Sequence, residues 1–179
     1  LVTPCALRVL ADQLLWRLQR RGHQQAALDP LALAVRPPVP DLDLTFHGLS
    51  DADLDTTFQV STAYFGRAEA TLADIREALE RTYCGTIGAE FMHIVNTEER
   101  HWIMSRMESV RGAPEFSSDH RLQILRQLNG AEGLERSLGS KYPGTKRFGL
   151  EGGESLIPMM SEAIQRVGGY GAKEICIGM

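Results

Sequence analysis

The stretch TLADIREALERTYCG, residues 71–85, decides the fold class because it carries a complete helix signal. Thr71 followed by Asp74 resembles a capping box, in which each side chain accepts a hydrogen bond from a free backbone N–H group at the helix start. Apolar side chains then recur every three or four residues on one helical face: Leu72, Ile75 and Leu79. We expect this helix to end before Gly85 and to bury its apolar face.

The same kind of spacing predicts further helices on both sides of this one, so that the fold is mainly α. Their expected starts are, in chain order, Thr3-Pro4, Ser50, Thr97, Ser117 or Ser118, and Gly153 to Ser155. The first stops near Gly22, the second ends at about Phe58, and the fourth runs to Leu138 unless it breaks near Asn129-Gly130. Apolar positions on these helices and on the 72–83 helix should be largely buried: Leu72, Ile75, Leu79, Trp102, Ile103, Leu122, Leu125 and Leu128.

Residues 23–49 form an expected extended, Pro-rich strap, because four prolines forbid a continuous helix: Pro30, Pro37, Pro38 and Pro40. An ordered stretch of this length needs a neighbouring surface to hold it. Charge also changes sign within it. Residues 1–36 carry five arginines and two aspartates, a net +3, whereas residues 37–58 carry five aspartates and no base, a net −5.

The composition describes an ordinary globular chain of 179 residues, with 43% hydrophobic and 23% charged residues. Its formal net charge of −4 argues against a strongly basic nucleic-acid-binding domain, and no apolar run is long enough to span a membrane. The three cysteines, Cys5, Cys84 and Cys176, match neither a disulfide framework nor a zinc pattern, so a reducing cytosol or mitochondrial matrix is the simpler expectation.

The last nine residues, GAKEICIGM (171–179), are typical of a turn followed by a short buried strand. A lone strand cannot satisfy its own backbone hydrogen-bonding groups and needs a sheet. The first residue is Leu1, with no initiator methionine and no secretory signal pattern. We therefore expect the chain to be a piece of a larger protein.

Two groups of aspartates are candidate cation ligands: Asp51, Asp53 and Asp55, and the pair Asp41 and Asp43. The first group alternates as in a calcium loop, but Thr56 stands where that loop needs glycine, so we interpret these acids as the start of a helix. The second group could hold a cation together with a third ligand. Solvated loop acids are the interpretation we favour for that pair.

The five histidines show no metal-ligand spacing: His23, His47, His93, His101 and His120. His93 lies in an apolar stretch, which favours a core or interface position over a catalytic one. His23 either binds an anion or anchors its loop. Cys84 comes at a helix end, where nothing lowers its pKa, so a nucleophilic role is not expected.

The segment KRFGLEGGESLIP, residues 146–158, places two bases and two glycines before a helix. Free N–H groups at a helix start favour anions, yet Glu151 and Glu154 oppose one there. The alternative, which we favour, is a glycine turn that packs the helix against a sheet.

Several long segments, in order along the chain, resemble the thiamine diphosphate-dependent first component of the 2-oxoglutarate dehydrogenase complex, in its bacterial form. They are RGHQQAALDPL (21–31), DLDLTFHGLSDADL (41–54), YCGTIGAEFMHI (83–94), the helix around Trp102, and AEGLERSLGSKYPGTKRFGLEGGESLIPM (131–159). Together they cover nearly the whole chain.

The resemblance implies that the parent protein is a homodimeric enzyme of the tricarboxylic acid cycle, located in the bacterial cytoplasm or in the mitochondrial matrix of a eukaryote. Such enzymes decarboxylate 2-oxoglutarate with thiamine diphosphate and magnesium and pass the succinyl group to the lipoyl arm of the dihydrolipoyl succinyltransferase component. The chain resembles an N-terminal fragment of them. The same pattern fits a relative that acts on 2-oxoadipate.

No catalytic, cofactor-binding or metal-ligating residue carries over to this chain by resemblance. In the family, a His-Arg-Gly-Arg segment of the active site follows the Gly-Met that stands here at residues 178–179. We therefore expect the isolated chain to be inactive and to bind neither cofactor nor nucleic acid nor membrane. Calcium-responsive members differ from this chain in the Pro-rich strap, so their cation site is not carried over either.

The resemblance suggests four parts: an N-terminal helix (1–22), the strap (23–49), a helical domain (50–145), and the first helix and strand of a truncated α/β thiamine-fold domain (146–179). It also suggests that the strap docks only when the remaining domains are present. The competing hypothesis is a helical interaction module that docks partner subunits and has no chemistry of its own. Nucleic-acid binding by residues 17–21 is a weaker third hypothesis, since an acidic stretch follows.

Overall fold

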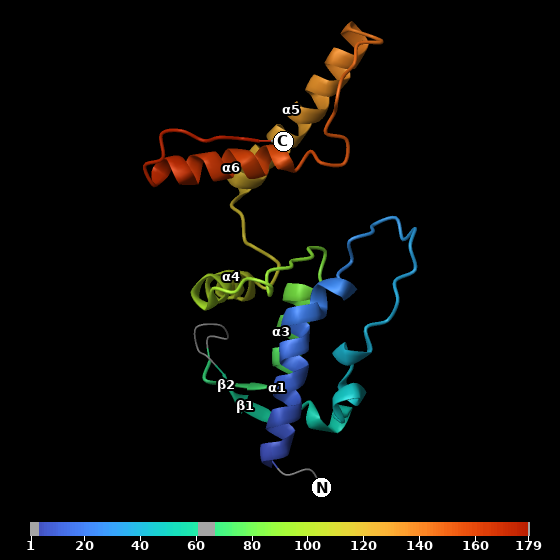
Figure 1. Ribbon diagram of the computed structural model, residues 1–179, viewed down its shortest axis with the longest axis vertical. Helices are drawn as coiled ribbons and strands as arrows, with labels where there is room; N and C mark the ends of the chain where they lie inside the picture. The colour runs from blue at the N-terminus through green and yellow to red at the C-terminus, as the bar shows by residue number, and fades with distance from the viewer. Residues whose placement is uncertain (1–3, 61–66, 179) are drawn as a thin grey trace. The chain divides into compact units, whose positions relative to one another are not determined.

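The computed structural model describes residues 4–60 and 67–178, which fall into two units, Leu1–Glu115 and Phe116–Met179. Thr3 and Met179 lie outside the described residues. The first unit contains α1 (Pro4–Arg21), α3 (Leu72–Tyr83), α4 (Thr97–Val110) and the strands β1 (Thr57–Gln59) and β2 (Glu69–Thr71); the second contains α5 (Ser118–Lys141) and α6 (Leu156–Gly169) (Figure 1). The expectation of a mainly helical fold is confirmed.

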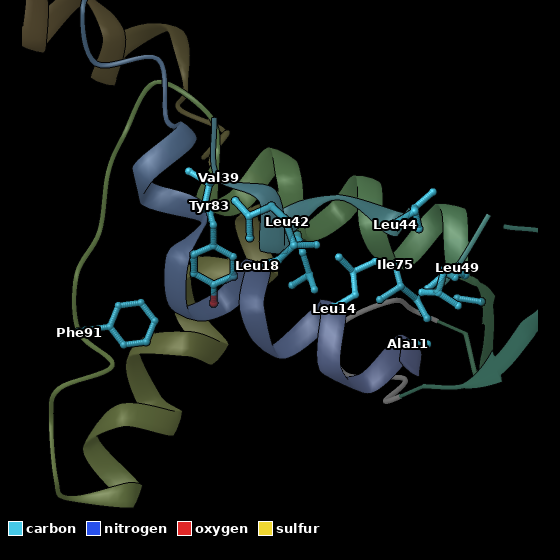
Figure 2. Close-up of a cluster of buried hydrophobic side chains, with 13 residues drawn as sticks. Ala11, Leu14, Leu18, Val39, Leu42, Leu44, Leu49, Ile75, Tyr83 and Phe91 are labelled. Carbon is cyan, nitrogen blue, oxygen red and sulfur yellow. The ribbon is translucent and has the colours of Figure 1, made fainter. Parts of the chain in front are cut away.

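The core of the first unit lies between α1 and α3, which pack side by side. Leucines from α1, from the segment 39–49 and from α3 meet there, and Figure 2 shows Leu14 and Leu18 of α1 directed at Leu42 and Ile75. Each such side chain contributes about 1.5–3 kcal/mol when fully buried. A Cβ atom on Gly22 would lie 2.7 Å from the Cβ atom of Tyr83, so only glycine lets the end of α1 approach α3 this closely.

The helix expected from residues 71–85 forms as predicted. The Thr71 side chain accepts a hydrogen bond from the Asp74 N–H group at 3.1 Å, and the Asp74 carboxylate accepts one from the Thr71 N–H group at 3.1 Å. Leu72, Ile75 and Leu79 are buried, as expected. The helix ends at Tyr83, before Gly85.

The short helix expected from Ser50 to Phe58 stops much earlier. A capping box between Ser50 and Asp53 does form, but it caps only the 3₁₀ turn η4 (Asp51–Asp53). The residues that follow are taken by β1, which pairs antiparallel with β2 so that Phe58 faces Ala70. Tertiary pairing therefore overrides the local helix signal.

The helix α4 starts at Thr97, capped by the Asn96 side chain, but Trp102 on it is 61% exposed, so its predicted burial is wrong. The neighbouring Ile103 packs against the core together with Met107. Successive helix residues point about 100° apart. A helix that presents Ile103 to the core therefore turns Trp102 away from it.

The second unit pairs α5 with α6, and α5 runs without a break through Gly130. Leu122 and Leu125 are 46% and 52% exposed, which contradicts their predicted burial, whereas Leu128 is half-buried. Within this unit α6 covers only part of α5, so the helical period is present but the Leu122 side of the stripe lacks a covering element.

The final strand expected after the turn at residues 169–172 does not form, since residues 172–178 have no strand pairing. Ile175 and Ile177 lie instead beside Met160, Ile164 and Val167 of α6, around a hollow of 420 Å³. A strand needs the backbone of a neighbouring strand, and the described part of this unit offers none.

The Pro-rich strap divides into two parts of different character. Residues 31–38 are exposed, including Leu33 at 83%. Val39, Leu42, Leu44 and Leu49 are buried in the core, on the 3₁₀ turns η2 (Pro40–Leu42) and η3 (Leu44–His47) and beside them. This second part therefore docks on α1 without any further domain, which corrects the expectation that the whole strap needs one.

Truncation of a core leucine should separate the buried positions from the exposed ones. We expect Leu72→Ala, at a fully buried position, to lower the free energy of unfolding by about 2–5 kcal/mol. The control Leu33→Ala, at an exposed position, should change it by less than about 0.5 kcal/mol. Urea denaturation followed by circular dichroism measures both. A loss below about 1 kcal/mol for Leu72→Ala would contradict the core described above.

The capping box of α3 should make stability depend on pH in the acid range. The Thr71 side chain and N–H group, with the Arg67 guanidinium 2.6 Å away, hold the pKa of Asp74 below its ordinary value. The stabilisation from this charge is therefore present above the unfolded-state pKa of about 4 and is lost as pH falls through the lower folded-state pKa.

Thr71→Ala should lower the free energy of unfolding by about 0.5–2 kcal/mol at neutral pH, because it removes the cap. The difference from the wild-type chain should shrink as the pH falls below about 4. Thermal melts across pH measure this, with the exposed Thr45→Ala as the control. A difference that stays constant over the acid range would show that Asp74 is not coupled to the cap.

Candidate functional site

The most complete polar cluster in the first unit joins the end of α1 to the strap. The Arg21 Nη1 atom lies 2.7 Å from the Oδ2 atom of Asp41, and the Arg17 Nη1 atom lies 3.4 Å from the same oxygen. Arg17 and Arg21 stand one helical turn apart, so both face η2. Asp41 is only 6% exposed, which corrects its interpretation as a solvated loop acid; Asp43 is exposed, as expected.

His47 closes the turn that carries Asp41. Its Nε2 atom lies 2.9 Å from the backbone oxygen of Asp41, so the tautomer with a proton on Nε2 donates a hydrogen bond there. The ring is buried and meets the Phe46 ring edge-on at 5.2 Å between centroids. The remaining carboxylate oxygen of Asp41, Oδ1, is buried without a hydrogen-bond partner.

A groove of 670 Å³ lies between the outer face of α1 and η3. Its walls are formed by Val9, Asp12, Gln13, Trp16, Arg17, Phe46 and His47. The guanidinium carbons of Arg17 and Arg20 lie 5.2 and 5.0 Å from the centroid of the Trp16 ring, which is a cation–π geometry. The groove thus combines exposed apolar surface with charge, as recognition surfaces do.

A second polar cluster, which the sequence analysis missed, connects three helices. The Glu108 carboxylate of α4 accepts hydrogen bonds from the Tyr83 hydroxyl of α3 at 2.8 Å and from the Gln19 amide of α1 at 2.9 Å. The three residues are far apart in sequence and belong to no motif. Only the packing of the helices brings them together.

The magnesium implied by resemblance does not fit the side chains of the described residues. Within residues 4–60 and 67–178, no three His, Cys, Asp or Glu side chains gather closely enough to hold a metal ion. The acids Asp51, Asp53 and Asp55 do not form a ligand set; Asp53 serves its capping box. Magnesium needs several oxygen ligands in a near-octahedral arrangement, and this donor set does not supply them.

The surroundings of Cys84 and His23 indicate structural rather than catalytic roles for these two side chains. Burial raises the pKa of the Cys84 thiol to about 11, and the nearby Glu80 charge adds to the rise, so the thiol stays protonated at neutral pH. His23 lies 3.7 Å from the Glu90 carboxylate, consistent with loop anchoring. His93 is exposed, so a core position is wrong, while an interface position, the other half of the expectation, stays a prediction.

In the glycine segment before α6, several backbone N–H groups donate hydrogen bonds to acceptors of the same chain. The Leu150 N–H group donates to the Glu135 carboxylate, the Gly152 N–H group to the Glu154 carboxylate at 3.1 Å, and the Gly153 N–H group to the Leu150 carbonyl at 2.6 Å. The chain's own acids thus take positions that an anion would need. The glycine turn therefore forms as interpreted, but within the described residues of this unit α6 packs against α5 rather than against a sheet.

The two arginines that contact Asp41 should differ in their contribution to stability. We expect Arg21→Ala to lower the free energy of unfolding by about 1.5–3 kcal/mol, because it removes a short charge-assisted hydrogen bond to a buried carboxylate. The matched control Arg17→Ala removes a longer contact and should cost about 0.5 kcal/mol. Urea denaturation measures both. Equal losses would show that the 2.7 Å contact does not dominate.

Among residues 4–60 and 67–178, no helix is long and apolar enough to cross a membrane. No family model matches the chain. Comparison with characterised proteins, in contrast, finds relatives along almost its whole length.

The chain is 55% identical over 167 residues to the 2-oxoglutarate dehydrogenase E1 component of Azotobacter vinelandii, which covers 93% of this chain and 18% of the relative. It is 48% identical over 172 residues to the protein of the same name from Cupriavidus necator, with 96% and 18% covered, and 42% identical over 161 residues to that from Haemophilus influenzae, with 89% and 17% covered. The chain thus spans less than a fifth of the length of these relatives. Along nearly all of its residues, the chain is therefore similar to one segment of bacterial 2-oxoglutarate dehydrogenase E1 components.

Proposed function

We propose that this chain is an N-terminal segment of a thiamine diphosphate-dependent 2-oxoglutarate dehydrogenase that decarboxylates 2-oxoglutarate. The observation that carries the proposal is the 55% identity to a 2-oxoglutarate dehydrogenase E1 component over 93% of the chain. This identity extends along nearly the whole segment, which supports a common origin with that enzyme.

Within that enzyme, the chain serves as a helical scaffold and contributes no reacting group. Its one nucleophile candidate, Cys84, has a raised pKa, and its buried acid, Asp41, is neutralised by arginines. Magnesium and thiamine diphosphate, which supplies the electron sink for decarboxylation, belong to other parts of the enzyme. We derive no catalytic step from the residues of this chain.

The partners of the enzyme follow from the same proposal. We infer a homodimer in the bacterial cytoplasm that works in the tricarboxylic acid cycle and passes succinyl to the lipoyl group of a dihydrolipoyl succinyltransferase. Bacterial relatives of the same name support the compartment. A docking role is supported separately by exposed apolar side chains on the strap, of which Leu33 is 83% exposed.

Calorimetry on two lengths of chain tests the proposal. The 179-residue chain should show no saturable binding of thiamine diphosphate with magnesium, because the described residues bring together no donor set for the metal. A chain of the full length of the relatives should bind both and decarboxylate 2-oxoglutarate, followed with an artificial electron acceptor. Addition of the succinyltransferase should then yield succinyl-lipoyl groups.

Two outcomes would contradict the proposal. Saturable micromolar binding of the cofactor by the 179-residue chain would show that the cofactor site lies within this segment and not, as proposed, elsewhere in the enzyme. A full-length enzyme that prefers 2-oxoadipate in the same assay would show that the substrate is wrong. Circular dichroism of the shorter chain provides the control, since a helical spectrum shows that absent binding does not result from unfolding.

A further inference from the structure

We propose that residues 29–36 form a preformed apolar finger that inserts into a groove of the same polypeptide beyond residue 179, and that Asp29 is the positioning residue that holds its shape. Three large apolar side chains of this short segment face solvent: Leu31, Leu33 and Val35 are 73%, 83% and 101% exposed. Single exposed apolar residues are ordinary on a protein surface, whereas three within five residues indicate an interaction site.

The Asp29 carboxylate organises the finger through hydrogen bonds from the backbone. Its Oδ2 atom accepts one from the Ala34 N–H group at 3.0 Å, and its Oδ1 atom accepts one from the Leu31 N–H group at 3.1 Å. Bonds from the N–H groups of Ala34, Leu33 and Leu31 hold the pKa of Asp29 below its ordinary value, so the carboxylate is charged at neutral pH. One side chain therefore fixes the course of the backbone from residue 29 to residue 34.

The backbone of the finger is strained at Ala32. Its φ angle is 50°, a left-handed conformation that a residue with a Cβ atom disfavours. The Ala32 N–H group donates to the Asp29 carbonyl at 3.2 Å, so the same residue holds this position too. Strain of this kind persists only where the surroundings impose it, and it is found at recognition loops that are ordered before they bind.

Both ends of the finger are fixed to the first unit. On one side, the Ala27 N–H group donates to the Gly85 carbonyl at 2.7 Å. The Leu28 side chain next to it lies against Gly88, where a Cβ atom would come 3.1 Å from its Cδ1 atom. On the other side, Val39 is buried in the core. The finger therefore cannot fold back to cover its own leucines, and another surface has to cover them.

The size of the finger selects the occupant. A stable interface between separate proteins buries about 800 Å² on each side, more than three side chains of one loop provide. A groove on the same polypeptide needs less contact, because the chain connection raises its effective concentration. The inference rests here on the proposed function, under which this chain is one segment of a longer enzyme, and it spans 18% of the length of a relative.

Thiol labelling at position 33 tests the inference without measuring activity. Leu33→Cys is placed in the 179-residue chain and in a chain of the full length of the relatives, and its reaction with a maleimide is followed by mass spectrometry of the peptide that carries it. We expect labelling at least about tenfold slower in the longer chain, because the thiol then lies in the groove. Equal rates at both lengths overturn the inference even if the longer chain decarboxylates 2-oxoglutarate. Slower labelling in a longer chain without that activity supports the finger and contradicts the proposed enzyme instead.

Thr45→Cys is the matched control, because Thr45 is an exposed turn residue of the same unit. It should react within about twofold at the same rate in both chains. Equal protection of positions 45 and 33 would overturn the inference, since the finger would then have no groove of its own. Protection of position 33 that requires added succinyltransferase, or that fades on dilution, would also overturn it and assign the finger to a second molecule.

The role of Asp29 has its own readout. Asp29→Ala in the full-length chain should raise the labelling rate at position 33 by at least about fivefold, because the finger loses its shape before docking. Adding Ala32→Gly should restore part of the protection, since glycine adopts a positive φ without the cost of a Cβ atom. Unchanged protection in Asp29→Ala would show that this residue does not position the finger.

Discussion

The burial of the leucine stripe of α1 is the interaction on which the first unit depends. Leu14 and Leu18 are almost completely buried between α3 and the segment 39–49. A twelve-residue helix such as α3 is marginal on its own in water, so its stability comes from this contact. Gly22 makes the contact possible at one end, because a Cβ atom at this position would lie only 2.7 Å from the Cβ atom of Tyr83.

The ion pair between Asp41 and the arginines of α1 fixes the position of the segment 39–49 along that helix. Removing a carboxylate from water is unfavourable unless opposite charge and hydrogen bonds compensate. Arg17 and Arg21 supply that compensation from one face of α1, and His47 holds the backbone of Asp41 in place. The contact fixes where the strap lies along α1, and therefore where the groove between α1 and η3 opens.

In the second unit, the packing of α5 against α6 leaves much apolar side-chain surface exposed. The α5 and α6 helices contact each other, yet Leu125, Met159 and Ile177 remain between 52% and 69% exposed. Apolar area of this extent lowers stability in water unless something covers it. Under the proposal that the chain is one segment of a longer enzyme, these exposed side chains are the positions expected to pack against the rest of that enzyme.

Local sequence determined where most of the long helices of this protein lie and how several of them begin. The capping box of α3, the start of α5 near Ser117 and the exposed Asp43 could all be predicted because the hydrogen bonds and spacings involved span only a few residues. The resemblance to a family could be found as well, since it depends on the order of residues. Burial along a helical stripe was predictable only where a partner existed, as at Leu72 but not at Leu125.

Tertiary structure alone decided which side chains meet. Asp41 and Arg21 are twenty residues apart, and Tyr83, Glu108 and Gln19 come from three helices, so no local pattern could reveal either cluster. Two expectations failed for the same reason: residues 172–178 do not form a strand, and only a short turn follows Ser50. A strand or a buried charge is stable only if a partner distant in sequence satisfies its polar groups, and the position of that partner is a property of the folded chain.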